Sequence, residues 1–298
     1  MRRALAVAAL GVALVAPAAL AGCSGDSGPT SAPSASTSTG TEAPSASTSG
    51  SPATPSGTAP PTAVAAPRPP VRACYRFNRD AAVAPTSDTR PVSCARLHTA
   101  VTYAVGSLDT VVVGHLLAVD SRRVRAQPAR ACPPLLRSYL GGTRERLRLS
   151  MLRAVWFTPT VEESDAGADW FRCDVVALAG PDRLAWLDGT LRGALSRPAG
   201  ESYAMCGTAE PGRPDFERVP CGARHSWRAV RTVSLAAEAG PKGAYPGAAA
   251  ARAAGQQICK DVGQRASSDK LNFSWGYEWP SATQWSGGQT YGLCWIPD

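Results

Sequence analysis

Two short segments pair a cysteine with a histidine four residues later, a combination that can bind a metal. Cys94 and His98 form the first pair, and Cys221 and His225 form the second. Zinc sites usually combine two such close pairs, and no second pair stands near either segment. We therefore expect no metal and no cofactor. The sequence favours imidazoles that are partly buried beside a disulfide, although a ligand-binding role for His98 and His225 stays open.

Other kinds of active-site chemistry have weaker support. The chain has no G-x-S-x-G segment for a serine nucleophile and no glycine-rich phosphate loop. Glu162, Glu163 and Asp165 are close together, but a glycosidase needs two carboxylates across a cleft. We expect no catalytic residue and no enzyme activity. The alternative is a cell-wall-active hydrolase or transferase with a cleft centred on a histidine.

The charge balance is basic and locally concentrated. The formal net charge is +8, and residues 121–153 contain nine arginines against one acid, Glu145. The nine are Arg122, Arg123, Arg125, Arg130, Arg137, Arg144, Arg146, Arg148 and Arg153. Such a segment is a solvated surface or attracts anionic lipid and cell-wall polymers. A nucleic-acid partner is not expected if the N-terminal segment, described next, exports the chain.

The N-terminal segment up to Cys23 has the layout of a bacterial export signal. Arg2 and Arg3 precede an uncharged apolar run from Ala4 to Leu20, and Leu20-Ala21-Gly22-Cys23 resembles a lipobox. In such signals the mature chain starts at the cysteine, which receives the lipid. We therefore expect a signal peptide over 1–22 and lipidation of Cys23, which would anchor the chain at the extracytoplasmic face of the plasma membrane.

The segment after Cys23 has the composition of a tether. From Ser24 to Pro70 every residue is Ser, Thr, Pro, Ala or Gly, except Asp26, Glu42, Val64 and Arg68. With so little apolar surface to bury, the segment cannot offset the entropy of ordering. We expect residues 23–70 to be a disordered tether.

The remaining chain repeats itself. Residues 71–298 contain eight cysteines in two sets of four, and Cys132 follows Cys94 at the same interval as Cys259 follows Cys221. A proline also precedes the fourth cysteine of each set at one common interval, as the pairs Pro159–Cys173 and Pro280–Cys294 show. These spacings predict two tandem small α+β domains, over 71–180 and 201–298, joined by a connector over 181–200.

Four cysteines in a domain allow three disulfide connectivities. The segments beside the first two cysteines resemble paired strands, whereas the third cysteine lies on an expected helix and the fourth on a final strand. The sequence therefore favours pairing first with second and third with fourth. The expected disulfides are Cys74–Cys94, Cys132–Cys173, Cys206–Cys221 and Cys259–Cys294.

Periodicity gives a coarse secondary structure. Alternation predicts strands over 98–105 and 227–235, and a further strand over 111–119. An alanine-rich segment predicts a helix over 247–265, and its first-copy counterpart is expected to start at Pro133 and Pro134. Leucines at helical spacing over 182–195 suggest a helix packed between the domains. Six aromatic residues near the end are expected to be core more than a binding surface for sugar or peptide: Trp275, Tyr277, Trp279, Trp285, Tyr291 and Trp295.

One motif resembles a known family. Val219-Pro220-Cys221-Gly222-Ala223-Arg224-His225 is similar to the actinobacterial septum formation-related domain, and Val92-Ser93-Cys94-Ala95-Arg96-Leu97-His98 is a looser match. The resemblance implies an exported or membrane-attached envelope protein linked to cell division, and it supplies no catalytic residues. We therefore expect a lipid-anchored, non-catalytic binding or scaffold module of the cell envelope. Its partners would be the membrane, anionic polymers, or envelope and division proteins.

Overall fold

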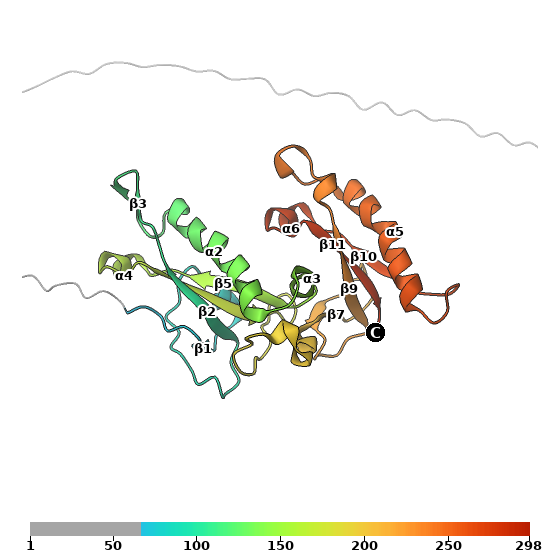
Figure 1. Cartoon of the computed structure of the whole chain (residues 1–298), viewed down its shortest axis with the longest axis horizontal. Helices are drawn as coiled ribbons and strands as arrows, with labels where there is room; N and C mark the ends of the chain where they lie inside the picture. Colours follow the sequence, from blue (N-terminus) through green and yellow to red (C-terminus); the bar gives the residue numbers. More distant parts are fainter. Residues whose placement is uncertain (1–66) are drawn as a thin grey trace, which may run out of the picture. The chain divides into compact units, whose positions relative to one another are not determined.

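The structure is a computed structural model, and it describes residues 67–298. The predictions for the signal peptide, for Cys23 and for the tether up to residue 66 lie outside these residues. The described chain has mixed α and β structure, with antiparallel sheets of four and five strands and one two-stranded hairpin (Figure 1). Within residues 67–298, no helix is long and apolar enough to cross a lipid bilayer.

The first sheet has the strand order β1-β2-β6-β5. Its strands are β1 (Cys74–Tyr75), β2 (Ala100–Ser107), β5 (Leu152–Phe157) and β6 (Trp170–Ala177). Helix α2 (Arg122–Leu140) packs on β2, β5 and β6, and every residue of the inner strand β6 is buried. Shorter elements surround it: α1 (Arg79–Val83), β3 (Val111–Val112), β4 (His115–Leu116), α3 (Arg144–Arg148) and α4 (Val161–Asp165).

The second sheet has the order β8-β7-β9-β11-β10. Its strands are β7 (Met205–Gly207), β8 (Arg218–Pro220), β9 (Trp227–Ser234), β10 (Gly276–Glu278) and β11 (Tyr291–Pro297). Helix α5 (Ala248–Ala266) packs on β9, β10 and β11, and the five-residue α6 is Ala282–Ser286. Short 3-10 turns are η1 (Ala194–Ser196), η2 (Pro198–Tyr203), η3 (Ala236–Glu238) and η4 (Pro241–Gly243).

The two sheets share details beyond strand order. Helices α2 and α5 each have 19 residues. Both long strand pairs also contain an irregularity at the same place: β2 skips Tyr103 in its register with β6, and β9 skips Val230 in its register with β11. A bulge re-aims the strand that carries it, so both sheets are bent at matching positions.

Helix α2 corrects the expectation that a helix would begin at Pro133. It begins at Arg122 and contains Pro128, Pro133 and Pro134. An internal proline costs about 3 kcal/mol because it lacks an N–H and crowds the preceding turn. The helix persists because every fourth residue is buried, at Val124, Pro128, Cys132, Leu136 and Leu140.

The connector corrects a second expectation. The leucines over 182–195 do not form a helix, and only the short turn η1 lies among them. Gly189, Leu191 and Gly193 have left-handed backbone angles, which interrupt a right-handed helix. The leucines are nevertheless apolar anchors, because Leu187, Leu191 and Leu195 pack into the core of the first sheet.

Other expectations hold with shifted boundaries. The strands expected over 98–105 and 227–235 are β2 and β9, and the expected helix over 247–265 is α5. The segment 111–119 is the hairpin β3–β4 and not one strand. Trp285 and Trp295 are buried and the other four late aromatics pack against the same cores, which confirms the core prediction for them.

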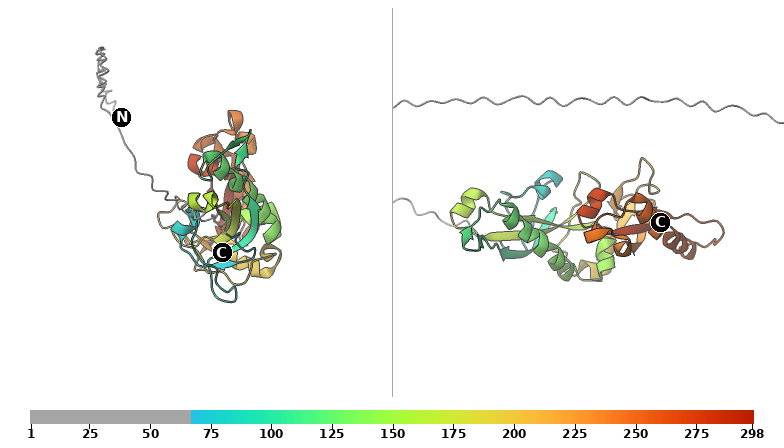
Figure 2. Two further views of the ribbon diagram at one scale, coloured as in Figure 1. Left: turned by 90° about the vertical axis from the view of Figure 1, so that its left-hand side faces the viewer. Right: turned by 90° about the horizontal axis from the view of Figure 1, so that it is seen from above.

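A main-chain bridge joins the two halves. The N–H of Met151 donates to the carbonyl of Tyr203 at 2.8 Å, and the N–H of Met205 donates to the carbonyl of Leu149 at 2.7 Å. Met151 and Met205 are buried together with Trp295 in one apolar cluster. The halves therefore share backbone pairing and core, and they adjoin in the right-hand view of Figure 2.

Candidate functional site

The structure contains four disulfides, and they are the pairs that the sequence favoured. They are Cys74–Cys94, Cys132–Cys173, Cys206–Cys221 and Cys259–Cys294. In each half one disulfide ties the first strand to the turn of the Cys-x3-His segment, and the other ties the long helix to the last strand. Closing loops of this size stabilises a fold by about 3–4 kcal/mol each in the chain-entropy estimate.

His98 is fully buried, and both of its ring nitrogens have partners. Nδ1 lies 2.7 Å from the carbonyl of Arg96, and Nε2 lies 3.0 Å from the carbonyl of Gly189 in the connector. The backbone of His98 also accepts a hydrogen bond from the N–H of Leu187 at 2.8 Å. His98 therefore fastens the connector to the first half and presents no free nitrogen.

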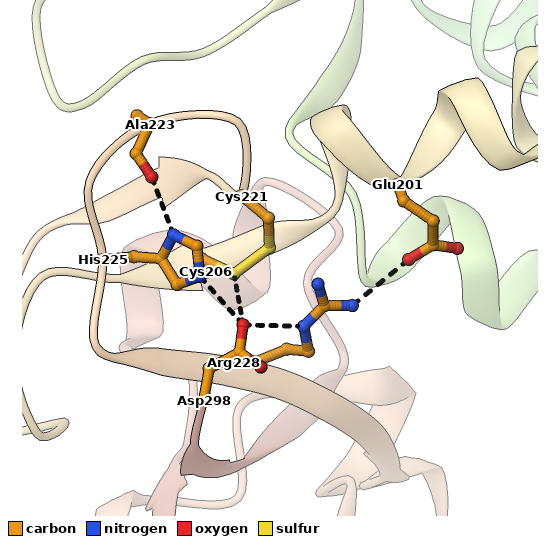
Figure 3. The surroundings of a disulfide bond; sticks show 7 residues. All are labelled: Glu201, Cys206, Cys221, Ala223, His225, Arg228 and Asp298. Carbon is orange, nitrogen blue, oxygen red and sulfur yellow. Dashed lines mark hydrogen bonds and ion pairs between the residues drawn. A yellow bond between two sulfur atoms is a disulfide. The ribbon is translucent and has the colours of Figure 1, made fainter.

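His225 repeats half of this arrangement. Its Nδ1 lies 2.7 Å from the carbonyl of Ala223, which is again two residues upstream (Figure 3). Its Nε2, however, lies 2.8 Å from a carboxylate oxygen of Asp298, and the ring is only partly buried. Both Cys-x3-His segments form turns, so neither histidine lies on a strand with its cysteine.

Asp298 belongs to a chain of charges that crosses to the first half. Its Oδ2 accepts from Arg228 Nε at 3.1 Å, and Arg228 Nη1 lies 3.2 Å from Glu201 Oε2 (Figure 3). Glu201 also contacts Arg146 of α3, with 2.8 Å between Oε1 and Nη2. The series His225–Asp298–Arg228–Glu201–Arg146 forms the charged network of the junction. It borders a pocket of about 240 Å³.

The charges in this network shift each other's protonation. Partial burial alone would raise the pKa of Asp298, but the hydrogen bonds from His225 and Arg228 outweigh it, and the pKa falls below the usual value. Burial would likewise lower the pKa of Arg228, but the carboxylates of Asp298 and Glu201 raise it. Asp298 and Arg228 are therefore both ionised at neutral pH.

Among residues 67–298, one group of side chains has metal-ligand spacing. Potential ligand atoms of Cys206, His225 and Asp298 lie within 4.8 Å of one another. The sulfur of Cys206 is bonded to Cys221, however, and a disulfide sulfur supplies no thiolate. The donor set that remains is one imidazole and one carboxylate, which does not fit a zinc site.

The geometry at His225 also differs from that of a general base. A catalytic histidine uses one nitrogen for its orienting carboxylate and keeps the other for the nucleophile. Here the second nitrogen faces the carbonyl of Ala223 at 2.7 Å. The arrangement can hold the residue after β11 against the turn that carries His225, which is a positioning role.

A second polar cluster lies inside the first half. Arg172 Nε lies 3.1 Å from Asp174 Oδ2, and both side chains are almost completely buried. The guanidinium also lies over the ring of Tyr75 at 4.0 Å and over that of Phe157 at 4.6 Å. Burial raises the pKa of Asp174 to about 6, against the lowering influence of Arg172 and of the hydrogen bond from Thr102.

The arginine-rich stretch divides into two groups. The five arginines on α2 are exposed and have no ion pair with any described residue: Arg122, Arg123, Arg125, Arg130 and Arg137. Two of the later arginines lie at the junction, where Arg146 pairs with Glu201 and Arg148 lies 4.2 Å from the ring centre of Tyr291. The α2 group is therefore the larger open cationic surface of this stretch.

Several residues of the junction were not identified from the sequence. Asp298, Arg228 and Glu201 lie far apart along the chain, and no short motif connects them. Trp186 was also missed. It is the only aromatic residue between Phe171 and Tyr203, and an isolated aromatic in the connector is a signal that could have been used.

Fold and site together describe a disulfide-stabilised protein of two joined antiparallel sheets, each carrying one long helix. A family model described as septum formation matches residues 72–294. That match covers most of the 298 residues, and the chain belongs to the septum formation family. A single match spans both sheets. No curated protein and no solved structure matches the chain.

Proposed function

We propose that this chain is a lipid-anchored, extracytoplasmic scaffold or binding module of the cell envelope that acts in septum formation. The family match supports the link to septum formation. The four disulfides support an oxidising compartment outside the cytoplasm. The lipobox-like segment ending at Cys23 supports attachment to the membrane. Labelling of cells with palmitate tests whether Cys23 carries a lipid. We expect label on the natural chain and none on Cys23→Ala.

A non-catalytic role is the part of the proposal that the geometry supports best. The observation that carries it is the use of both motif histidines as braces: His98 holds the connector and His225 holds Asp298. The cysteines of residues 67–298 are all bonded in pairs, which supports the same view. The exposed arginines of α2 support attraction to anionic lipid or wall polymers.

The two halves are further proposed to be copies of one duplicated unit. The shared strand order, the equal helix lengths and the matching bulges support this origin. Because the family match is continuous over 72–294, the unit that functions is taken to be the joined pair and not either copy alone.

Complementation tests the non-catalytic role. In a host whose own gene for this chain is deleted, we expect fewer or misplaced septa, and the natural chain should restore them. His225→Gln and Asp298→Asn should restore septation too, provided that circular dichroism shows them folded, because a scaffold needs only the fold. A folded variant that fails to restore septation would instead support the hydrolase or transferase alternative.

A further inference from the structure

A groove runs between the connector and the second half, and none of the five residues of the charged network lines it. Its volume is about 680 Å³, within the range of small-molecule sites. The connector contributes Arg183, Leu184 and Trp186, and the turn before His225 contributes Gly222 and Arg224. The walls also include Tyr203 and Glu217. We call this region the connector groove.

Trp186 is the unusual residue of the connector groove. The protein has eight tryptophans, all inside the described range, and Trp186 alone is exposed, with 53% of its surface accessible. The guanidinium of Arg76 lies 5.0 Å from the centre of its ring, which supports the indole from one side. An indole held in place and facing solvent offers a flat apolar face at little entropic cost.

The charged side chains beside Trp186 are free to bind. Neither Arg183 nor Arg224 has a side-chain hydrogen bond or an ion pair among residues 67–298, although each lines the groove. Glu217 lies near Arg183. A Cβ built on Gly180 would lie 3.5 Å from Glu217 Oε2 and 3.6 Å from Arg183 Nη2. Two guanidinium groups match a carboxylate, and the Glu217 carboxylate matches amide N–H or hydroxyl donors.

We propose that the connector groove binds an N-acetylated sugar that carries a carboxylate. The apolar face of the sugar ring would stack on Trp186, the carboxylate would bind between Arg183 and Arg224, and acetamido or hydroxyl donors would reach Glu217. An exposed aromatic ring beside unpaired polar side chains suits a ligand with one apolar face and a polar rim. The inference rests on the proposed function only for the presence of such sugars around the protein.

The test uses the full chain carrying Cys23→Ala, so that no acyl group is attached. The probe is the disaccharide of N-acetylglucosamine and N-acetylmuramic acid with its lactyl carboxylate free. Isothermal titration calorimetry measures its binding. The comparison ligands are the neutral dimer of N-acetylglucosamine and a short acidic peptide. We expect the acidic disaccharide to bind at least about tenfold more tightly than either, because only it offers both the ring face and the carboxylate.

Two variants locate the binding. Trp186→Ala should weaken binding of the disaccharide by about tenfold or more, because it removes the stacking surface. Arg183→Gln combined with Arg224→Gln should weaken it by about tenfold or more and abolish the preference over the neutral dimer. Leu271→Ala and Arg213→Gln change exposed residues outside the groove and should bind as the unchanged chain does. Circular dichroism verifies that every variant is folded.

Several results would overturn the proposal. They are no binding of the disaccharide, equal binding of the neutral dimer, tighter binding of the acidic peptide, and binding that survives Trp186→Ala. Each is independent of septation: a chain that restores septa but binds no such sugar refutes the groove alone. A chain that binds the sugar but is not needed for septa refutes the proposed function alone.

Discussion

Each half of the protein pairs an aspartate, on its last strand or directly after it, with an arginine, and the two pairs behave in opposite ways. Asp174 is buried beside Arg172, and desolvation raises its pKa to about 6. Asp298 is partly exposed beside Arg228, and hydrogen bonds lower its pKa. The same chemical pair is therefore costly to ionise in one half and easy to ionise in the other, because the surrounding solvent differs.

The halves also differ at the residues that flank the last cysteine. Arg172 and Asp174 flank Cys173 in the first half, whereas Leu293 and Trp295 flank Cys294 in the second. The two strands occupy the same place in their sheets. One architecture thus contains either a buried ion pair or an apolar pair at this position. The comparison teaches that the ion pair is not needed to form the sheet.

Exchanging these residues should give the largest effect. Leu293→Arg with Trp295→Asp would bury charges in a half that lacks the rings of Tyr75 and Phe157, and we expect a loss of about 4 kcal/mol or more in the free energy of unfolding. Denaturant unfolding measures it. The reverse kind of change, which replaces the ion pair with apolar side chains in Arg172→Leu with Asp174→Leu, should cost less than about 1 kcal/mol or stabilise the protein. A larger loss in the reverse change would mean that the ion pair is worth more than an apolar pair.

The pH dependence of stability should reveal Asp174. Its pKa of about 6 in the folded protein lies above the usual 3.8. The stability that Asp174 contributes is therefore fully present below about pH 4 and is lost as pH rises through 6. We expect the free energy of unfolding to fall by about 2 kcal/mol from this group between pH 4 and 7. Asp174→Asn should flatten the profile. Asp298 has the opposite sign, since its contribution is present above its usual pKa and is lost only at lower pH.

Replacing the two motif histidines should cost different amounts of stability, because His98 is more deeply buried than His225. His98→Ala leaves a cavity where a fully buried ring stood and removes the hydrogen-bond partner of two partly buried carbonyls, so we expect a loss of about 2–3 kcal/mol. His225→Ala changes a partly exposed ring and should cost about 1 kcal/mol. Thermal unfolding of both variants gives the comparison. Equal losses would show that the connector contact of His98 adds nothing.

Asp298→Asn should have the smallest effect. Surface ion pairs contribute about 0.2–1 kcal/mol, and the asparagine oxygen can still accept from His225 Nε2 and Arg228 Nε. The difference from the unchanged chain should shrink further in 1 M salt, because exposed charges are screened. Unfolding measured at low and high salt would detect it. A loss in the free energy of unfolding clearly above about 1 kcal/mol would mean that Asp298 stabilises the fold more than an exposed ion pair does.

The sequence predicted the features that local spacing controls. The cysteine intervals led to the disulfide pairs, and alternation located β2 and β9. Helix α2 was misplaced because proline has a local penalty that burial of Val124 and Leu136 and the disulfide at Cys132 override. The connector was misjudged because leucine spacing does not report the left-handed angle at Leu191.

The site depended on long-range pairing and was harder to predict. The motif histidines were found by their repeat, but their partners Gly189 and Asp298 were not. Asp298 lies 73 residues after His225, so only the antiparallel register of β9 and β11 brings it near. Trp186 is informative for its exposure, and exposure is a property of the folded chain.

The disulfides also determine how the protein would respond to mechanical tension. If residues 23–70 tether the chain to a membrane, a pull enters the described structure at residue 67 and reaches a covalent cross-link at Cys74. The Cys74–Cys94 bond closes a loop of 20 positions, and the Cys132–Cys173 bond closes a loop of 41 positions. Neither loop can add to the length of the chain when it is stretched. A pull from such a tether would therefore lengthen the first half by much less than its full chain length.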